Sequence, residues 1–331
     1  MKTKKTLILE ADESGFAAAG DIIRRGGLVV FPTETVYGLG ANALDAAACA
    51  GIFAAKGRPQ DNPLIVHTAD VFALARLTRD IPPRAAALIQ AFMPGPLTLI
   101  LPKTQDIPDA VTAGLPTVGL RVPSDAAAAG FLRHAGVPVA GPSANLSGRL
   151  SPTTFAMARE AMEGRADAII RAEDSRVGLE STIARVSESG IEILRPGGVS
   201  EEAIRAVIQD CPVRGAFSEN PDDPPPAPGM KYTHYKPRAE VFLYKSGSRI
   251  TEAGGKKTGV ITLTGKAASF PRAFLVREAA SPEDYARRLY ADFFVFDSLG
   301  CEIILAEYPP EEGIGRAVAN RLLKASGGRF V

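Results

Sequence analysis

A proline-rich run at residues 221–228 limits the possible folds of this 331-residue chain more than any other feature. The run reads PDDPPPAP and holds five prolines in eight residues. Proline lacks a backbone N–H and favours extended polyproline II, so the run cannot lie inside a sheet. It therefore separates a larger N-terminal block from a smaller C-terminal one. We predict a first domain over residues 1–211, a linker over 212–238 and a second domain over 239–331.

Charge, hydropathy and cysteine use exclude several classes of protein. Lysine plus arginine (38) nearly balances aspartate plus glutamate (37), and the net charge of +1 argues against holding a polyanion by bulk charge. The N-terminus lacks the apolar run of a signal peptide, and no segment has the about 18 apolar residues of a membrane span. Cys49, Cys211 and Cys301 show neither disulfide nor zinc spacing. We expect a cytoplasmic protein with reduced thiols and no membrane contact.

Short apolar runs and helical patterns are mixed in the first block. Helices are predicted over residues 15–25, where Gly26 and Gly27 end the pattern, and over 46–56. Strands are predicted at residues 28–31, 64–67, 97–101, 118–122 and 137–140, followed by a hairpin at 183–186 and 191–194. Because these strands are far apart in the sequence, we expect a twisted mixed sheet with helices.

The second block alternates more regularly. Strands are predicted at residues 240–244, 258–263 and 292–297, and helices at 281–291 and 314–326. Alternation of this kind is typical of a small doubly wound, Rossmann-like α/β domain. The fold class of the whole chain is therefore predicted as α/β.

The usual enzyme motifs are missing from this sequence. Gly265-Lys266 is followed by Ala267 rather than by Ser or Thr, and no glycine precedes it at the offset of a phosphate-binding P-loop. The patterns GxGxxG after a strand, GxSxG and HExxH are absent too. A functional site must be sought among other polar residues.

Polar residues gather where predicted strands and helices end. Lys56 and Arg58 are two residues apart, and side chains at i and i+2 of an extended segment point the same way, which favours a grip on one polyphosphate. Ser143 and Asn145 repeat that spacing with neutral hydrogen-bonding groups. Taken singly, such residues are more often turns, caps or solvated helix ends. Together they predict a concave site for a polyanion and a small polar ligand.

Several segments in a fixed order carry a resemblance to a known family. They read FPTETVYGLG, KGRPQDNPLIVH, PGPLTLIL, GLRVPSD, GPSANLSGRLSPT, LESTIARV and ILRPGG. They resemble the YrdC-like family, and PGMKYTHYKP with GIGRAVANRLLKAS resembles its long two-domain form. The resemblance implies a YrdC-like catalytic domain that makes L-threonylcarbamoyladenylate from L-threonine, bicarbonate and ATP and releases pyrophosphate. It also implies a partner, the machinery that transfers threonylcarbamoyl to the adenosine next to the anticodon of tRNA.

The resemblance assigns roles to individual residues. The family's Lys-x-Arg and Ser-x-Asn signature falls on Lys56, Arg58, Ser143 and Asn145, which are the implied catalytic residues. The implied ATP contacts are Arg58, Asn62, Thr117, Asn145, Ser151, Thr153, Arg195, His234 and Tyr235. The implied threonine contacts are Thr35, His67, Arg121, Ser143 and Ser181.

The chemistry of this reaction adds further expectations. Charge develops on phosphate oxygens, so we expect ATP to act as substrate together with Mg²⁺, without protein metal ligands and without a covalent nucleophile. Residues 229–235 combine a glycine, cations and aromatics, which favours a lid over ATP.

Two other functions remain open at this point. A module that binds double-stranded RNA would use a local basic patch, and a carbamoyl-transfer enzyme would use carbamoyl phosphate without threonine. The sequence leaves open the oligomeric state, the role of the second domain and direct RNA contact.

Overall fold

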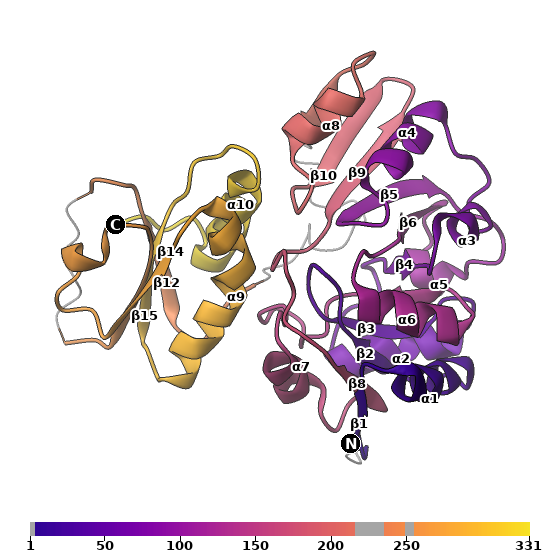
Figure 1. Cartoon of the computed structure of the whole chain (residues 1–331), viewed down its shortest axis with the longest axis horizontal. Coiled ribbons are helices and arrows are strands. Elements are labelled where there is room, and N and C mark those ends of the chain that lie inside the picture. The colour runs from indigo at the N-terminus through magenta and orange to yellow at the C-terminus, as the bar shows by residue number, and fades with distance from the viewer. Residues whose placement is uncertain (1–3, 216–234, 249–254) are drawn as a thin grey trace.

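The computed structural model describes residues 4–215, 235–248 and 255–331. Residues 229–234 of the predicted lid, His234 among them, lie outside the described residues, so the lid and the linker stay predictions, as do the domain limits. We call residues 4–215 the large lobe and the described residues from 235 to 331 the small lobe (Figure 1). Each lobe is built around a sheet of its own.

The large lobe holds a sheet with the strand order β1-β8-β2-β3-β7-β4-β6-β5-β9-β10-β11. Its strands are β1 (Leu7–Glu10), β2 (Val29–Phe31), β3 (Gly38–Asn42), β4 (Ile65–His67), β5 (Leu97–Pro102), β6 (Thr117–Arg121), β7 (Val139–Gly141), β8 (Ala168–Arg171), β9 (Thr182–Ser187), β10 (Gly190–Arg195) and β11 (Val213–Gly215). Neighbours such as β4 and β6 are parallel, whereas β7 runs antiparallel to both β3 and β4. The expected mixed sheet is confirmed.

Helices pack on both faces of this sheet. They are α1 (Glu13–Arg24), α2 (Ala46–Lys56), α3 (Val71–Ala75), α4 (Pro83–Phe92), α5 (Asp109–Thr112), α6 (Ala126–Ala135), α7 (Phe155–Met162) and α8 (Glu201–Val207). Successive strand residues point to opposite faces, so Val29 and Phe31 of β2 pack with α1 and α6, while Val30 packs in the core that holds α2. Every residue of β2 is buried for this reason.

Helix α2 matters for the site because of where it ends. The Asp45 carboxylate accepts hydrogen bonds from the N–H groups of Ala47 and Ala48, which satisfies two free donors of the first turn. Gly57 ends the helix with φ of 61°, a left-handed conformation that glycine adopts without strain. Lys56 is therefore held in the last turn, and the chain leaves the helix at a defined angle.

The small lobe holds a fully parallel sheet with the order β12-β15-β13-β14. Its elements are β12 (Glu240–Tyr244), β13 (Thr258–Leu263), the 3₁₀ helix η1 (Ala267–Ser269), β14 (Leu275–Ala279), α9 (Pro282–Ser298), β15 (Ile303–Glu307) and α10 (Gly315–Ser326). Helices α9 and α10 lie on the side of the sheet that faces the large lobe (Figure 1). The α/β class predicted for this part is confirmed.

One predicted element of the small lobe is wrong. Residues 292–297 belong to α9, not to a strand. Their β-favouring residues suggested a strand, but Tyr285, Leu289, Phe293 and Phe296 are spaced by three or four and are all buried, which is a helical period. The strand that follows α9 is β15, which was not predicted.

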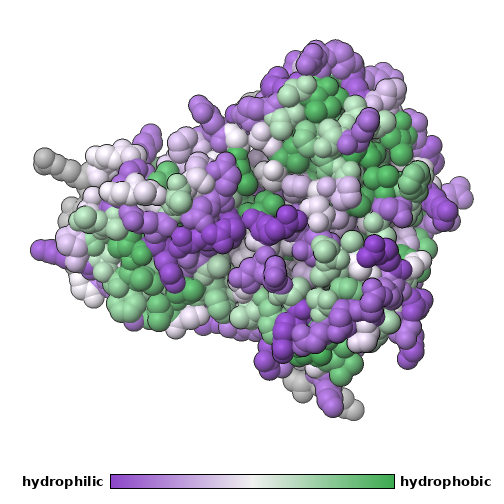
Figure 2. Space-filling view, viewed as in Figure 1, coloured by the Kyte–Doolittle hydropathy of each residue, from purple (hydrophilic) through white to green (hydrophobic). Residues whose placement is uncertain are grey.

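The two lobes meet through an apolar seam. Val36, Met157 and Leu179 of the large lobe belong to the same buried cluster as the core of α9 and α10. Gly178, with φ of 76°, approaches the backbone of Ala286 and Arg287 in α9 so closely that a Cβ atom would collide with it. Hydrophilic residues cover the junction on the face seen in Figure 2. No helix among the described residues is long and apolar enough to cross a membrane.

Candidate active site

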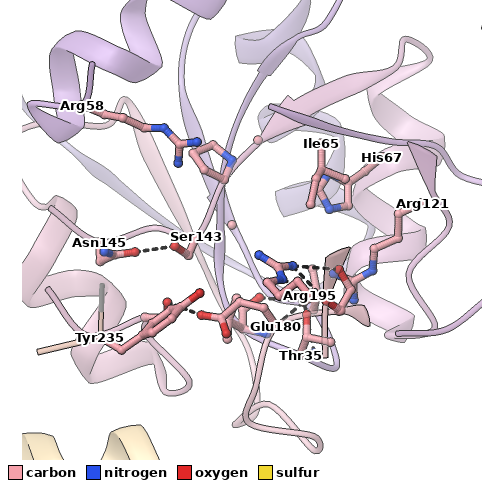
Figure 3. Close-up of a pocket in the computed structure, with 17 residues that line it drawn as sticks. Thr35, Arg58, Ile65, His67, Arg121, Ser143, Asn145, Glu180, Arg195 and Tyr235 are labelled. Carbon is pink, nitrogen blue, oxygen red and sulfur yellow. Dashed lines mark hydrogen bonds between the residues drawn. The ribbon is translucent and has the colours of Figure 1, made fainter. Parts of the chain in front are cut away.

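A cavity in the large lobe brings most of the predicted site residues together (Figure 3). It is lined by residues of β3, β4, β6, β7 and β10, by the loops after β2 and β7 and before β9, by Arg58 after α2 and by Tyr235 of the small lobe. The predicted residues that line it are Thr35, Arg58, His67, Arg121, Ser143, Asn145, Ser151, Ser181, Arg195 and Tyr235. Figure 3 shows Arg58 and Asn145 on one side and His67 and Arg121 on the other.

Lys56 lies behind the wall of this cavity. It is 3% exposed, and its Nζ donates hydrogen bonds to the backbone oxygens of Ser143 and Asn145, each at 2.5 Å. Burial, helped by the charge of Arg58, holds the pKa of Lys56 well below its usual range. The two cations thus have different partners, because Arg58 donates from Nη2 to the backbone oxygens of Asn62 and Pro63.

The turn that Lys56 holds carries two of the predicted catalytic side chains. Ser143 Oγ donates to Asn145 Oδ1 at 2.5 Å, and Asn145 Nδ2 donates to the backbone oxygens of Leu146 and Arg149. These contacts fix the amide of Asn145 at the cavity wall. Lys56, Ser143 and Asn145 of the signature are therefore joined by hydrogen bonds, whereas Arg58 lines the cavity with other partners.

The opposite side of the cavity contains a buried ion pair that sequence reasoning missed. Arg121 Nη2 lies 2.9 Å from Glu34 Oε1, and the two side chains are 4% and 2% exposed. Arg121 Nε donates to the backbone oxygen of Gly95 at 3.4 Å. The only available signal for Glu34 was its place beside Thr35 in FPTETVYGLG.

His67 lies beside Arg121 because their parallel strands place the two residues in register. Burial first, and then the charge of Arg121, lower the pKa of His67 to about 3. The imidazole is thus neutral at neutral pH. The ring of Phe31 packs edge-on against it, with the ring centroids 5.5 Å apart.

Hydroxyl groups and a second arginine complete this part of the wall. Ser181 Oγ lies 2.7 Å from Thr98 Oγ1, and Thr35 Oγ1 lies 2.8 Å from Thr33 Oγ1. Arg195 ends β10 and donates from Nε and Nη2 to the backbone oxygen of Ser181 at 3.1 and 2.9 Å. The β9–β10 hairpin brings these two residues together although they are 14 positions apart.

Three predicted ATP contacts do not line the cavity. Asn62 is buried, and neither polar atom of its side chain has a hydrogen-bond partner. Thr117 begins β6 opposite Pro102, and Thr153 Oγ1 contacts the sulfur of Met157 at 3.7 Å. Among the described residues no cluster of three or more His, Cys, Asp or Glu side chains is placed to hold a metal ion.

Glu180 is a second carboxylate that sequence reasoning missed. It lines the cavity, accepts a hydrogen bond from Ser151 Oγ at 2.6 Å and accepts another from Arg321 Nε of α10 at 2.9 Å. Burial alone would raise the pKa of Glu180, but the charges of Arg321 and Arg195 and the bond from Ser151 outweigh burial and lower it to about 2. Glu180 directly precedes Ser181 in LESTIARV, whereas Arg321 is 141 positions away.

Tyr235 joins this group from the start of the small lobe. Its ring stacks on Tyr290 of α9 with centroids 5.6 Å apart and planes 23° apart, and the guanidinium of Arg321 lies over it at 5.0 Å. Residues of the small lobe therefore form part of the wall or its direct support.

Comparisons with known proteins agree on one family. Residues 21–197 match the Sua5, YciO and YrdC family, described as telomere recombination, and residues 199–327 match the threonylcarbamoyl-AMP synthase C-terminal domain. The chain is 40% identical to a threonylcarbamoyl-AMP synthase of Bacillus subtilis over 100% of both chains. It is 43% identical to that of Pyrococcus abyssi over 95% of this chain and 94% of the other.

A solved structure supports the same relationship. The crystal structure of Pyrococcus abyssi Sua5 complexed with L-threonine superposes with a TM-score of 0.89 at 40% identity. The match covers 98% of this chain and 99% of that one.

Proposed function

Because this chain belongs to the Sua5, YciO and YrdC family, we propose that it is a nucleotidyltransferase that makes threonylcarbamoyl-AMP from L-threonine, bicarbonate and ATP. The observation that supports this most is the cavity itself. Predicted ATP contacts such as Arg58 and Asn145 lie on one side, and predicted threonine contacts such as His67 and Arg121 lie on the other (Figure 3). An amino acid and a nucleotide bound this way would meet in the middle.

The reaction divides into two steps. The amine of threonine adds to bicarbonate and releases water to give a carbamate. A carbamate oxygen then forms a bond to the α-phosphorus of ATP while the bond from that phosphorus to pyrophosphate breaks. Holding the reactants at attack distance can contribute roughly 7–11 kcal/mol. A cavity walled by buried residues also keeps water from the unstable carbamate.

The threonine side of the site follows from charge and geometry. A guanidinium has five N–H donors, and Glu34 and Gly95 engage only part of those on Arg121. Donors therefore remain for the substrate carboxylate. With its pKa lowered to about 3, His67 is a poor acceptor of the amine proton. We assign it to hydrogen bonding of threonine rather than to proton transfer.

The nucleotide side would stabilise phosphate charge. Arg58 and Arg195 line the cavity and are suited to phosphate oxygens. Glu180, the carboxylate of the cavity lining, is already engaged by Arg321, so Mg²⁺ would enter on the phosphates of ATP rather than on protein ligands. When bound, the ion would neutralise phosphate charge. We place the product in tRNA threonylcarbamoylation in the cytoplasm.

The experiment that tests this proposal measures pyrophosphate release. Purified protein is mixed with ATP, bicarbonate and each amino acid in turn, and threonylcarbamoyl-AMP is identified by mass spectrometry. Release that depends on threonine is the expected result. Turnover of carbamoyl phosphate without threonine would favour carbamoyl transfer instead. Salt-dependent RNA binding without any ATP turnover would favour an RNA-binding module.

Serine should be used less well than threonine in the same assay. The two amino acids differ by one methyl group, and an apolar pocket discriminates such a difference by about 10- to 200-fold in kcat/KM. Competing the two at equal concentration and scoring the products by mass measures the ratio. Equal use would show that the site has no contact for the methyl group.

A further inference from the structure

Glu180 belongs to the large lobe, but most of its partners belong to the small lobe. Tyr290 Oη of α9 donates to it at 3.3 and 3.1 Å, and Arg321 Nε of α10 donates at 2.9 Å. Ser151 is its hydrogen-bond donor from the large lobe. The Glu180 carboxylate thus links the cavity wall to both long helices of the small lobe.

The ion pair between Glu180 and Arg321 is buried. Arg321 is 0% exposed and Glu180 is 5% exposed. A buried ion pair gains little net stability over an apolar contact, because removing both charges from water costs about as much as their attraction returns. The apolar seam around Leu179 already holds the two lobes together. The pair therefore calls for a reason beyond docking.

The charges around Glu180 suggest that reason. With its pKa near 2 the carboxylate is negative at neutral pH, inside a cavity proposed for a triphosphate. Two guanidiniums act on it, those of Arg321 and Arg195. Arg195 lines the cavity, whereas Arg321 does not. Without Arg321 the carboxylate would be left with Arg195 and Lys324 as counter-charges, and its attraction for Arg195 would hold that cation away from phosphate.

We propose that Arg321 is a positioning residue for ATP, which neutralises Glu180 from the small lobe and so keeps this carboxylate from competing with the phosphates for Arg195. This inference rests on the proposed function only in taking ATP as the ligand of Arg195. It gives the small lobe a defined part in the reaction. Its contribution is a counter-charge behind the wall rather than a group that touches substrate.

The test compares ATP affinity and kinetics in the full-length chain. Arg321→Met should weaken ATP binding, measured by calorimetry without threonine, by about tenfold or more, since a buried charge loses its partner. The KM for ATP should rise by a similar factor, while the KM for threonine and kcat change little. Glu180→Gln combined with Arg321→Met should recover most of the ATP affinity, because a neutral amide needs no counter-charge.

Arg316→Met is the matched control. Arg316 lies on the same helix and pairs across the lobes with Glu201 and Glu202, away from the cavity. Its loss should leave ATP affinity unchanged. Equal weakening by Arg316→Met, or no recovery in the double variant, would overturn the proposal by reducing Arg321 to a docking residue.

Two further readouts keep the test decisive. If Arg321→Met does not fold, Arg321→Lys, which keeps the charge, and the double variant should both bind ATP within a few-fold of wild type; loss of ATP binding in the folded double variant overturns the proposal. Wild-type protein that binds ATP but makes no threonylcarbamoyl-AMP contradicts the proposed function alone. Unchanged ATP binding by folded Arg321→Met contradicts this inference alone.

Discussion

Lys56→Met should lower the rate of threonine-dependent pyrophosphate release by roughly 100-fold or more, the scale of losing one preorganised polar group in an active site. The reason is indirect. Lys56 Nζ donates to the backbone oxygens of Ser143 and Asn145, and methionine fills the same space without a donor. Both oxygens then lack their hydrogen-bond donor, and the Ser143–Asn145 turn loses its fixed position.

The same change should lower the free energy of unfolding. Two backbone oxygens lose a donor, at about 1–3 kcal/mol for each group left unsatisfied. Urea unfolding measures this loss separately from the rate. Lys103→Met is the control, because Lys103 Nζ also bonds a backbone oxygen, but that oxygen belongs to Ile107, which does not line the cavity as Ser143 and Asn145 do. It should cost stability and leave synthesis intact; an equal loss of synthesis would refute a specific role for Lys56.

Arg121→Met should destabilise the protein by about 3–5 kcal/mol, because it leaves the buried carboxylate of Glu34 without its cation. Threonine-dependent synthesis should be lost as well. Chemical denaturation and the pyrophosphate assay measure the two effects.

A second variant separates stability from binding. Glu34→Gln combined with Arg121→Met removes both charges, so it should recover most of the lost stability while synthesis stays absent. Synthesis that returned with stability would mean that Arg121 is not the ligand of the threonine carboxylate. If Arg121→Met unfolds at the same denaturant concentration as the wild-type protein, the Glu34–Arg121 ion pair does not contribute the stability expected of it.

Sequence reasoning predicted those cavity-lining residues whose signals are local. Ser143 and Asn145 follow a strand, Arg58 follows a helix, and a motif surrounds each of them, so spacing and resemblance were enough. It missed Glu180, which lines the cavity, and Glu34, which pairs with the cavity-lining Arg121, because a carboxylate is unexpected at a site for anionic ligands. What makes both acceptable is an arginine far away in the chain, Arg121 or Arg321, and a single sequence does not reveal such pairs.

The helices and strands, like the site residues, could be predicted where the signals lie close together in the sequence. Helix α2 has the bounds that were predicted for it, and the structure shows that both ends are fixed by neighbouring residues, Asp45 at the first turn and Gly57 at the last. The end of α9 was taken for a strand because β propensity at residues 292–297 was weighed above the continuing helical period. Packing of that period against the sheet of the small lobe decides the outcome, and this packing is a tertiary effect.

Because of Gly178, substitutions in the seam between the lobes have different effects at different positions. Where side chains meet, a substitution alters how strongly the lobes adhere. At Gly178 the backbones themselves meet, so any side chain there would act as a spacer and move α9 outwards. The distance from Tyr290 to the cavity is thus limited by main-chain contact at Gly178, in addition to the side-chain packing of the seam.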